Sequence, residues 1–207
     1  MTGLPFIYFD LGNVLLRFSR QRQFQQMAEV AGIAPEEVRQ TVMEGGLYVL
    51  YETGAIDDDE FFERFCEATG ARCDVQQLQR AGSDIFWANP SMIPVVAALW
   101  SAGYRLGILS NTCGAHWEWI RDGRFGLLPG YFEQIVLSYE VGVMKPGREI
   151  YEAAADKARL RPAEIFYMDD LEENVRGARQ VGLDAVVYTS TPALVNDLRQ
   201  RGVQFNY

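Results

Sequence analysis

The stretch "FIYFDLGNVLL", residues 6–16, contains an apolar run that ends at the carboxylate of Asp10 and turns at Gly12 and Asn13. A short, continuous apolar run bounded by turn residues is typical of a strand that is buried on both faces. Asp10 then has two interpretations. It starts a turn, as Asp, Gly and Asn commonly do, or it is a carboxylate of an active site at the end of the strand. This stretch alone favours the turn.

Length, composition and charge limit the classes of function. The chain has 207 residues, of which 48% are hydrophobic, so it can bury a core of one domain with a modest insertion. Its formal net charge of -9 argues against a nucleic-acid partner or an anionic membrane surface, because phosphate backbones require basic patches. A phosphorylated ligand would therefore need a local positive site.

Cysteine usage and the lack of long apolar stretches predict a cytoplasmic protein. Cys66, Cys73 and Cys113 form no CxxC pair, which is typical of reduced thiols. The N-terminus has no basic region followed by a long apolar segment, and no stretch approaches the roughly 20 apolar residues of a membrane-spanning helix. The sequence leaves open whether the protein is a monomer or a dimer.

Residues 89–207 alternate between short apolar strands and amphipathic helices. The predicted strands are 104–109, 134–138, 165–168 and 185–188, and the predicted helices are 91–102, 116–121, 148–158, 172–181 and 192–201. Such alternation indicates right-handed βαβ crossovers and a parallel sheet. We therefore predict an open, Rossmann-like α/β core of three layers, formed by residues 1–18 and 89–207.

Residues 19–88 have helical spacing and no convincing strand. Gly54 suits a helix C-cap, Asp57 an N-cap, and Glu60 completes a capping box three residues later. We predict an all-helical cap inserted after the first strand. Ligands of open α/β sheets bind beyond the carboxyl ends of the strands, so the cap would cover the ligand crevice.

Polar side chains follow four of the predicted strands. They are Asp10, then Ser110-Asn111-Thr112, then Lys145 in the loop "YEVGVMKPG", and then Asp169-Asp170 with Asn174 one helical turn later. Each group alone has an ordinary interpretation as a turn, a solvated lysine or a helix N-cap. Because the carboxyl ends of parallel strands meet at one edge, four such groups argue together for a site.

This set of groups suits phosphoryl transfer. Mg²⁺ prefers hard oxygen ligands and takes a few carboxylates together with water and substrate phosphate. A carboxylate can attack phosphorus and form an aspartyl-phosphate that water hydrolyses. Lysine and polar donors neutralise the oxygens of the transferring group. The sequence therefore predicts a magnesium-dependent reaction on a small phosphorylated metabolite.

Four motifs in order carry a family resemblance: "FDLGNVL", "ILSNT", "GVMKP" and "YMDDLEENVRGA". Over essentially its whole length the chain resembles the haloacid dehalogenase-like hydrolase superfamily, and the helical insertion after the first motif resembles the first cap class of that superfamily. The resemblance implies a hydrolase that uses Mg²⁺ and an aspartyl-phosphate intermediate.

The resemblance also implies a role for each matching position, divided between the phosphoryl group and the metal. Asp10 would be the nucleophile and a metal ligand, and the phosphoryl group would be held by Ser110, Asn111 and Lys145. Asp170 would be the main further metal ligand, with Asp169 assisting. The carbonyl of Gly12 would complete the metal site, and Asn174 would support these ligands.

The sequence departs from the family pattern at Gly12. Most phosphatases of this family have an Asp there, which protonates the leaving oxygen and later activates water, and a positioned general acid typically contributes about 10²–10⁴-fold in rate. The variant "DLGN" resembles the bacterial α-D-glucose-1-phosphate phosphatase subgroup, whose anomeric leaving oxygen tolerates negative charge. Sugar phosphates are accordingly the leading substrate class.

Two alternatives remain open. A 2-haloacid dehalogenase needs no acid, because halide leaves unprotonated, but it also needs no metal and would leave Asp169-Asp170 unexplained. A non-catalytic binding or regulatory protein would keep the fold without turnover. His116, the single histidine, either supplies the missing proton or forms local bonds at a helix start.

The cap is expected to select the substrate. Tyr48, Tyr51, Glu52 and Trp87 are candidate pocket residues, since aromatic faces with polar tips suit sugars. The alternative is that these residues pack the core of the cap itself.

Overall fold

A five-stranded parallel sheet forms the centre of the chain, in the order β5-β4-β1-β6-β7. This computed structural model describes residues 5–126 and 128–207. The strands of the sheet are β1 Phe6–Phe9, β4 Arg105–Ser110, β5 Gln134–Leu137, β6 Ile165–Asp169 and β7 Asp184–Val187. Phe6 lies opposite Arg105 on one side and Ile165 on the other, so β1 is the central strand. The predicted parallel sheet is confirmed.

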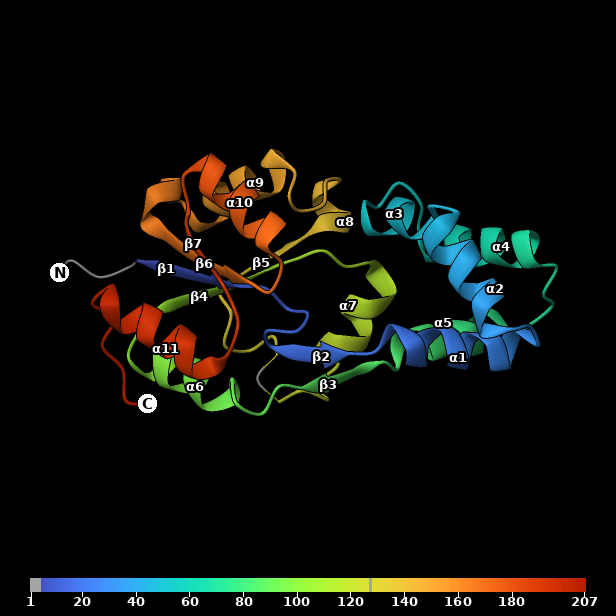
Figure 1. Cartoon of the computed structure of the whole chain (residues 1–207), viewed down its shortest axis with the longest axis horizontal. Helices are drawn as coiled ribbons and strands as arrows, with labels where there is room; N and C mark the ends of the chain where they lie inside the picture. Colours follow the sequence, from blue (N-terminus) through green and yellow to red (C-terminus); the bar gives the residue numbers. More distant parts are fainter. Residues whose placement is uncertain (1–4, 127) are drawn as a thin grey trace.

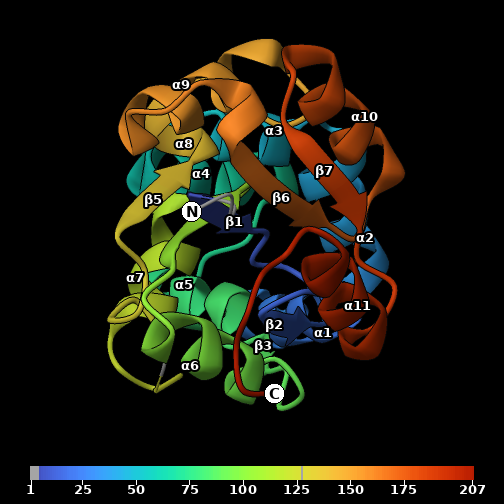
Figure 2. The ribbon, with the colours of Figure 1, turned by 90° about the vertical axis from the view of Figure 1, so that its left-hand side faces the viewer.

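Helices cover both faces of this sheet (Figures 1 and 2). One face carries α6 Ile93–Ser101, α7 Gly114–Arg121 and α11 Thr191–Gln200; the other carries α9 Arg148–Ala158 and α10 Glu172–Val181. A short helix, α8 Ser138–Val141, follows β5, and a 3₁₀ turn, Pro162–Glu164, precedes β6. The three layers confirm the predicted Rossmann-like α/β class.

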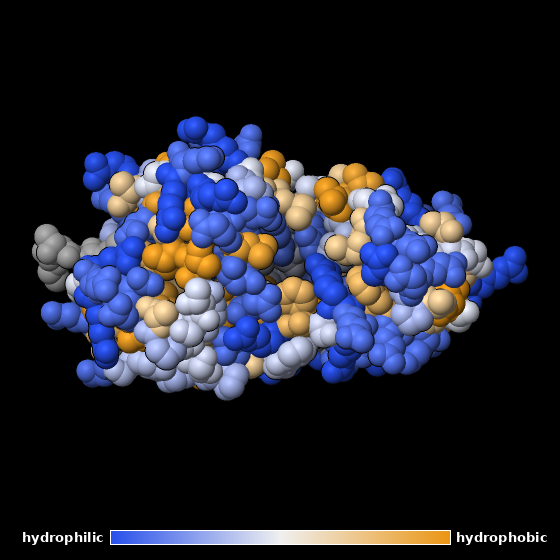
Figure 3. Space-filling model, viewed as in Figure 1, coloured by the Kyte–Doolittle hydropathy of each residue, from blue (hydrophilic) through white to orange (hydrophobic). Residues whose placement is uncertain are grey.

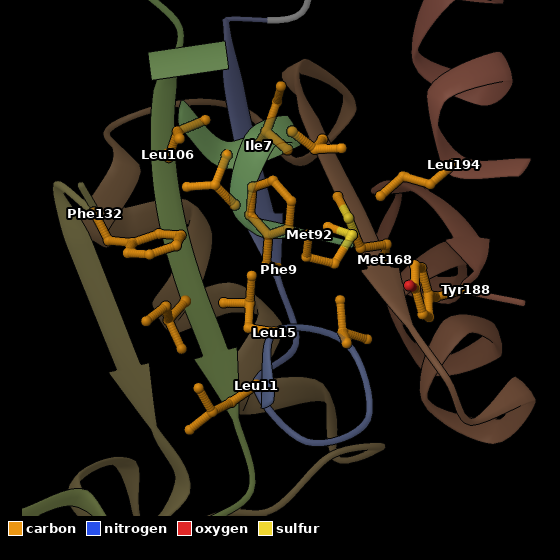
Figure 4. Close-up of a cluster of buried hydrophobic side chains, with 14 of the residues drawn as sticks. Ile7, Phe9, Leu11, Leu15, Met92, Leu106, Phe132, Met168, Tyr188 and Leu194 are labelled. Carbon is orange, nitrogen blue, oxygen red and sulfur yellow. The ribbon is translucent and has the colours of Figure 1, made fainter. Parts of the chain in front are cut away.

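Strand β1 is apolar throughout because it faces a hydrophobic cluster on each side. Ile7 and Phe9 point into the cluster beneath α6 and α11, which also contains Met168 (Figure 4). Phe6 and Tyr8 point into the cluster beneath α9 and α10. All four side chains of the strand are fully buried. A carboxylate that directly follows such a strand is therefore held at the rim of the core.

A group of helices between β2 and β3 lies at one end of the molecule (Figure 1). They are α1 Arg20–Ala31, α2 Pro35–Arg39, a π-helical turn Gln40–Glu44, α3 Leu47–Glu52, α4 Asp58–Thr69 and α5 Val75–Ser83. The capping box predicted at Asp57 and Glu60 is present at the start of α4. These helices share a hydrophobic cluster of their own. We propose that they form the predicted cap domain, and we call them the cap below.

A two-stranded antiparallel ribbon joins the cap to the core. It pairs β2 Leu16–Phe18 with β3 Phe86–Ala88, with Arg17 opposite Trp87. The prediction that residues 19–88 contain no strand is wrong at β3, because a three-residue strand is too short to show a period. The ribbon forms where the chain enters and leaves the cap side by side. We propose that the boundary between core and cap lies here.

The surface is mostly polar on the face seen in Figure 3. Hydrophobic residues gather there over α3, where the exposed fractions of Val49 and Leu50 are 56% and 39%. Among the residues that the structure describes, no helix has the length and apolar character needed to cross a membrane.

Gly107 generates a test of the packing between β4 and β1. A Cβ at this position would lie 2.4 Å from a ring atom of Tyr8 and 2.7 Å from one of Phe6. We expect Gly107→Ala to lower the free energy of unfolding by about 1–3 kcal/mol, the usual cost of overpacking a core. Urea denaturation measures this change. A Cβ at Gly130 meets no atom within 4 Å, so Gly130→Ala is the control. Equal stability of the two variants would contradict the packing described.

Candidate active site

The ammonium group of Lys145 joins the ends of three strands. Its Nζ donates hydrogen bonds to Oδ1 of Asp10 over 2.7 Å, to Oδ2 of Asp169 over 2.7 Å and to the carbonyl of Leu109 over 3.1 Å. Asp10 follows β1, Leu109 lies on β4 and Asp169 ends β6. All three charged side chains are buried. The structure thus brings together three of the charged groups that the sequence placed at one sheet edge.

Asp169 is saturated with hydrogen bonds. Besides the Lys145 ammonium, the Tyr167 hydroxyl donates to Oδ2, the Asn174 amide donates to Oδ1 and Oδ2 over 3.0 and 3.1 Å, and the Leu171 N–H donates to Oδ1 over 2.9 Å. This carboxylate therefore holds Lys145 in place, and the support predicted for Asn174 is directed to it. Sequence reasoning missed Tyr167, although its position two residues before Asp169 puts both side chains on one face of β6.

Asp170 is more open than Asp169. It accepts a hydrogen bond of 2.9 Å from the side-chain amide of Asn13. Asn13 has φ of 56°, in the left-handed region that Asn tolerates, so it both turns the chain after Gly12 and holds Asp170. This role of Asn13 was not predicted, and its only sequence signal was its place in the turn.

The acidic cluster fits a divalent cation. Asp10, Asp169 and Asp170 each offer a carboxylate oxygen, and these oxygens lie within 4.8 Å of one another. When all three carboxylates are ionised, the single ammonium of Lys145 compensates only one of the three negative charges. Hard oxygen ligands of this kind suit Mg²⁺, and Gly12 lies on the turn between Asp10 and Asn13, where its carbonyl can add to the set.

Burial and neighbouring charges set the pKa values of this cluster. Burial raises the pKa of Asp10 to about 7; Lys145 opposes this rise and Asp169 adds to it. Burial works to lower the pKa of Lys145, but the two carboxylates outweigh it and hold the value above the ordinary one. Burial likewise works to raise the pKa of Asp169, yet Lys145 and Tyr167 keep it low. Lys145 is therefore charged, and additional positive charge would favour ionised Asp10.

Asn111 positions Lys145. Its amide donates to the Lys145 carbonyl over 3.0 Å, and its Oδ1 accepts from the Lys145 N–H over 2.7 Å. Both ends of the side chain are thus engaged with the main chain of Lys145. The contact of Asn111 with substrate stays a prediction. The buried Ser110 hydroxyl makes a bond of 3.3 Å to the carbonyl of Asn111 and remains suited to a phosphoryl oxygen.

A cavity of about 40 Å³ lies between the core and the cap beside Ser110. Gly12, Phe18, Arg20 and Glu52 also line it. It can hold a few water molecules. A Cβ added to Gly12 would lie 3.1 Å from Cε1 of Phe18, so the Phe18 ring fills the space toward which a side chain at position 12 would point. Phe18 was not predicted for the pocket, because only its place in space brings it there.

His116 lines the same cavity but is bound as a neutral ring. Its Nε2 lies 3.1 Å from the Gly82 carbonyl, and its Nδ1 lies 3.3 Å from the Tyr48 hydroxyl. Burial and then the charge of Arg20 lower the pKa of His116 to about 3. The prediction that His116 supplies the missing proton is therefore not supported. Its ring joins the start of α7 to the cap.

The other candidate pocket residues of the cap have different surroundings. Tyr48 and Tyr51 are buried in the hydrophobic cluster of the cap, where Tyr51 stacks on Phe61 with 4.3 Å between the ring centroids. Trp87 lies on β3 with 47% of its surface exposed. Of the four residues suggested from the sequence, Glu52 is the one that lines the cavity beside Ser110.

Comparisons with known proteins agree with this geometry. A family model described as "haloacid dehalogenase-like hydrolase" matches residues 6–182. The chain is 23% identical over 184 residues to D-ribitol-5-phosphate phosphatase of Bacteroides thetaiotaomicron, covering 86% of this chain and 88% of that protein. It is 32% identical over 98 residues to glyceraldehyde 3-phosphate phosphatase of Methanopyrus kandleri, covering 47% of this chain and 41% of that protein.

A solved structure is also similar. It is a HAD family enzyme from Bacteroides thetaiotaomicron in complex with magnesium and inorganic phosphate, with a TM-score of 0.79 and 26% sequence identity. The likeness covers 89% of this chain and 94% of that chain.

The neutral state of His116 predicts a pH dependence of stability. The pKa is about 3 in the folded chain and about 6.5 in the unfolded chain. Between these values the unfolded chain binds more protons, so this contribution to stability is complete above pH 7 and decreases as the pH falls. We expect His116 to account for a loss of about 2 kcal/mol between pH 7 and pH 5.

Urea denaturation at both pH values measures this loss, with His116→Gln as the comparison. The other titrating groups are shared by the two proteins, so the difference between their pH dependences isolates the histidine. If the stability of His116→Gln decreased as steeply as that of the wild type, the ring would not be neutral in the folded chain.

Proposed function

The chain belongs to the haloacid dehalogenase-like hydrolases, and within this family we propose that it is a magnesium-dependent phosphatase of small phosphate monoesters. The observation that carries the proposal is the Lys145 ammonium between Asp10 and Asp169, with Asp170 completing a cluster of three carboxylates. One site therefore holds a carboxylate that can act as nucleophile, an ammonium group fixed beside it, and further carboxylates that can bind a metal ion. A phosphoryl-transfer reaction uses all three.

Asp10 is the proposed nucleophile. One of its carboxylate oxygens is held by Lys145, and its main-chain N–H donates to the Met168 carbonyl over 2.9 Å, so the side chain is fixed at the end of β1. Attack on phosphorus forms an Asp10–O–P bond as the bond from phosphorus to the leaving oxygen breaks. Water then attacks the phosphorus, the Asp10–O–P bond breaks, and inorganic phosphate and free Asp10 result.

Lys145 and Ser110 are the proposed groups around the phosphoryl oxygens. Asp10 and Asp169 raise the pKa of Lys145 and so favour its charged form, and its position is set by Asn111 on one side and Asp169 on the other. Ser110 lines the cavity. Donors that are fixed before the substrate arrives stabilise developing charge without reorganisation during the reaction.

The residues that would hold Mg²⁺ are Asp10, Asp170 and the carbonyl of Gly12. Asp169 is less suited to direct contact, since its two oxygens already accept from Lys145, Tyr167, Leu171 and Asn174. When bound, the cation would neutralise phosphoryl oxygens and favour the ionised form of Asp10. The likeness to a structure that holds magnesium and inorganic phosphate supports this proposal.

The proposed substrate class is a sugar or polyol phosphate. Two relatives act on compounds of this class, D-ribitol 5-phosphate and glyceraldehyde 3-phosphate, which supports the class without identifying the compound. The dehalogenase alternative is less well supported, because halide displacement needs no metal and does not explain why the carboxylate of Asp170 is placed in the site. The chain's own charge of -9 leaves Lys145 and the metal as the sources of attraction for an anion.

The nucleophile assignment predicts that Asp10→Asn abolishes phosphate release from p-nitrophenyl phosphate in the presence of Mg²⁺. An amide keeps the shape of the side chain but does not attack phosphorus. Released phosphate measures turnover, and circular dichroism and the urea midpoint show whether the fold is kept. Asp184→Asn is the matched control, because Asp184 begins β7, opposite Phe166, at the other end of the strands from the site, and pairs with Arg201. A folded Asp10→Asn variant with wild-type turnover would exclude this mechanism.

A further inference from the structure

The proposed reaction needs a proton donor that the first motif does not provide. The leaving oxygen of an alkyl phosphate departs as an alcohol, so it must gain a proton, and Gly12 has no group to give one. The Phe18 ring occupies the adjoining space. Any substitute must therefore reach the cavity from another element.

Glu52 reaches the cavity from the cap. It is the last residue of α3, and it lines the cavity together with Gly12 and Ser110. Within the described part of the chain it is the one carboxylate that lines this cavity. Because the cavity has a volume of about 40 Å³ and holds only a few waters, a group that lies in it is near both Glu52 and the Ser110 hydroxyl.

Arg20 fixes Glu52 in this position. Its Nη2 lies 3.3 Å from Oε1 of Glu52, while Nη1 donates to Oε1 of Gln23 over 3.0 Å. The guanidinium also lies over the Tyr48 ring, 4.1 Å from the centroid. Arg20 is thus held from three sides and serves as a fixed partner for Glu52. An arginine stays charged and cannot itself supply the proton.

The surroundings of Glu52 favour its protonated form more than water does. Its side chain is 9% exposed, and burial raises its pKa above the ordinary value, although Arg20 and, more weakly, Lys145 oppose this. The other groups near it carry no charge at neutral pH: Tyr48 and Cys113 have raised pKa values, and His116 is neutral. A buried carboxyl of this kind can exist in both forms near neutral pH.

We propose that Glu52 is the catalytic acid and base of this chain, in place of the carboxylate that Gly12 lacks. This proposal rests on the proposed phosphatase function. Neither Arg20, which stays charged, nor His116, whose Nε2 lies 3.1 Å from the Gly82 carbonyl, offers the exchangeable proton.

The proton balance closes over one turnover. In the first step the bond from phosphorus to the leaving oxygen breaks, the Asp10–O–P bond forms, and the proton of the Glu52 carboxyl moves to the leaving oxygen. In the second step the oxygen of a water molecule bonds to phosphorus and the Asp10–O–P bond breaks. The proton of that water moves to the Glu52 carboxylate, which restores the acid.

The test compares two substrates of similar shape that differ in their need for a proton. The p-nitrophenolate ion leaves phosphorus readily without protonation, whereas the phenolate of phenyl phosphate leaves far less readily. We expect Glu52→Gln to reduce kcat/KM for phenyl phosphate by about 10²–10⁴-fold. The same variant should leave kcat/KM for p-nitrophenyl phosphate nearly unchanged, because this parameter reports the steps up to formation of the aspartyl-phosphate.

Three further measurements distinguish a catalytic role from a structural one. Glu52→Asp keeps a carboxyl group and should recover part of the activity on phenyl phosphate. For the wild type, kcat/KM for phenyl phosphate should decrease as the pH rises, because Glu52 ionises. Glu52→Gln should not show this decrease. Glu63→Gln, the same change at an exposed position on α4, should behave as the wild type.

The outcomes separate this proposal from the proposed function. A wild type that hydrolyses neither substrate with Mg²⁺ would overturn the phosphatase function itself. If the wild type is active and Glu52→Gln lowers kcat/KM equally for both substrates, or for neither, the acid–base role is excluded while the phosphatase function stands. If Glu52→Gln fails to fold, the pH profile of the wild type and the activity of Glu52→Asp decide.

Discussion

A single buried ammonium group organises the site. Lys145 reaches back over the sheet edge and binds Asp10 after β1, the Leu109 carbonyl on β4 and Asp169 at the end of β6. Burying charge is costly, and removing one partner of a buried pair typically costs about 3–5 kcal/mol. The three strand ends are therefore held in fixed relation to one another. The proposed nucleophile, phosphoryl site and metal site all take their positions from this contact.

The cap is coupled to the same edge of the core. Cys113, which lies shortly after Ser110 at the end of β4, belongs to the hydrophobic cluster of the cap, as does Ala115. A Cβ on Gly54 of the cap would lie 2.1 Å from the Tyr139 carbonyl, so the two parts approach closely. The cavity of about 40 Å³ lies between these two parts and can hold a few waters.

Sequence patterns were sufficient for the core and for the charged groups of the site. The helices at 148–158 and 172–181 coincide with the observed ones, because their amphipathic periods are long and their ends are marked. The meeting of Asp10, Lys145 and Asp169 followed from the rule that parallel strands share one edge. Contacts between distant segments were not predictable: the β2–β3 ribbon, the Phe18 ring beside Gly12 and the binding of Asn111 to Lys145 have no local period. Whether a buried side chain such as His116 is neutral depends on its neighbours in space.

The most direct test of the central claim is a crystal structure of the protein with Mg²⁺ and beryllium fluoride, which mimics a phosphoryl group on a carboxylate. We predict a trifluoroberyllate bonded to Asp10, with Lys145 and Ser110 contacting its fluorides and the cation between Asp10 and Asp170. A trifluoroberyllate bound elsewhere, or a cation that contacts neither carboxylate, would contradict the shared site.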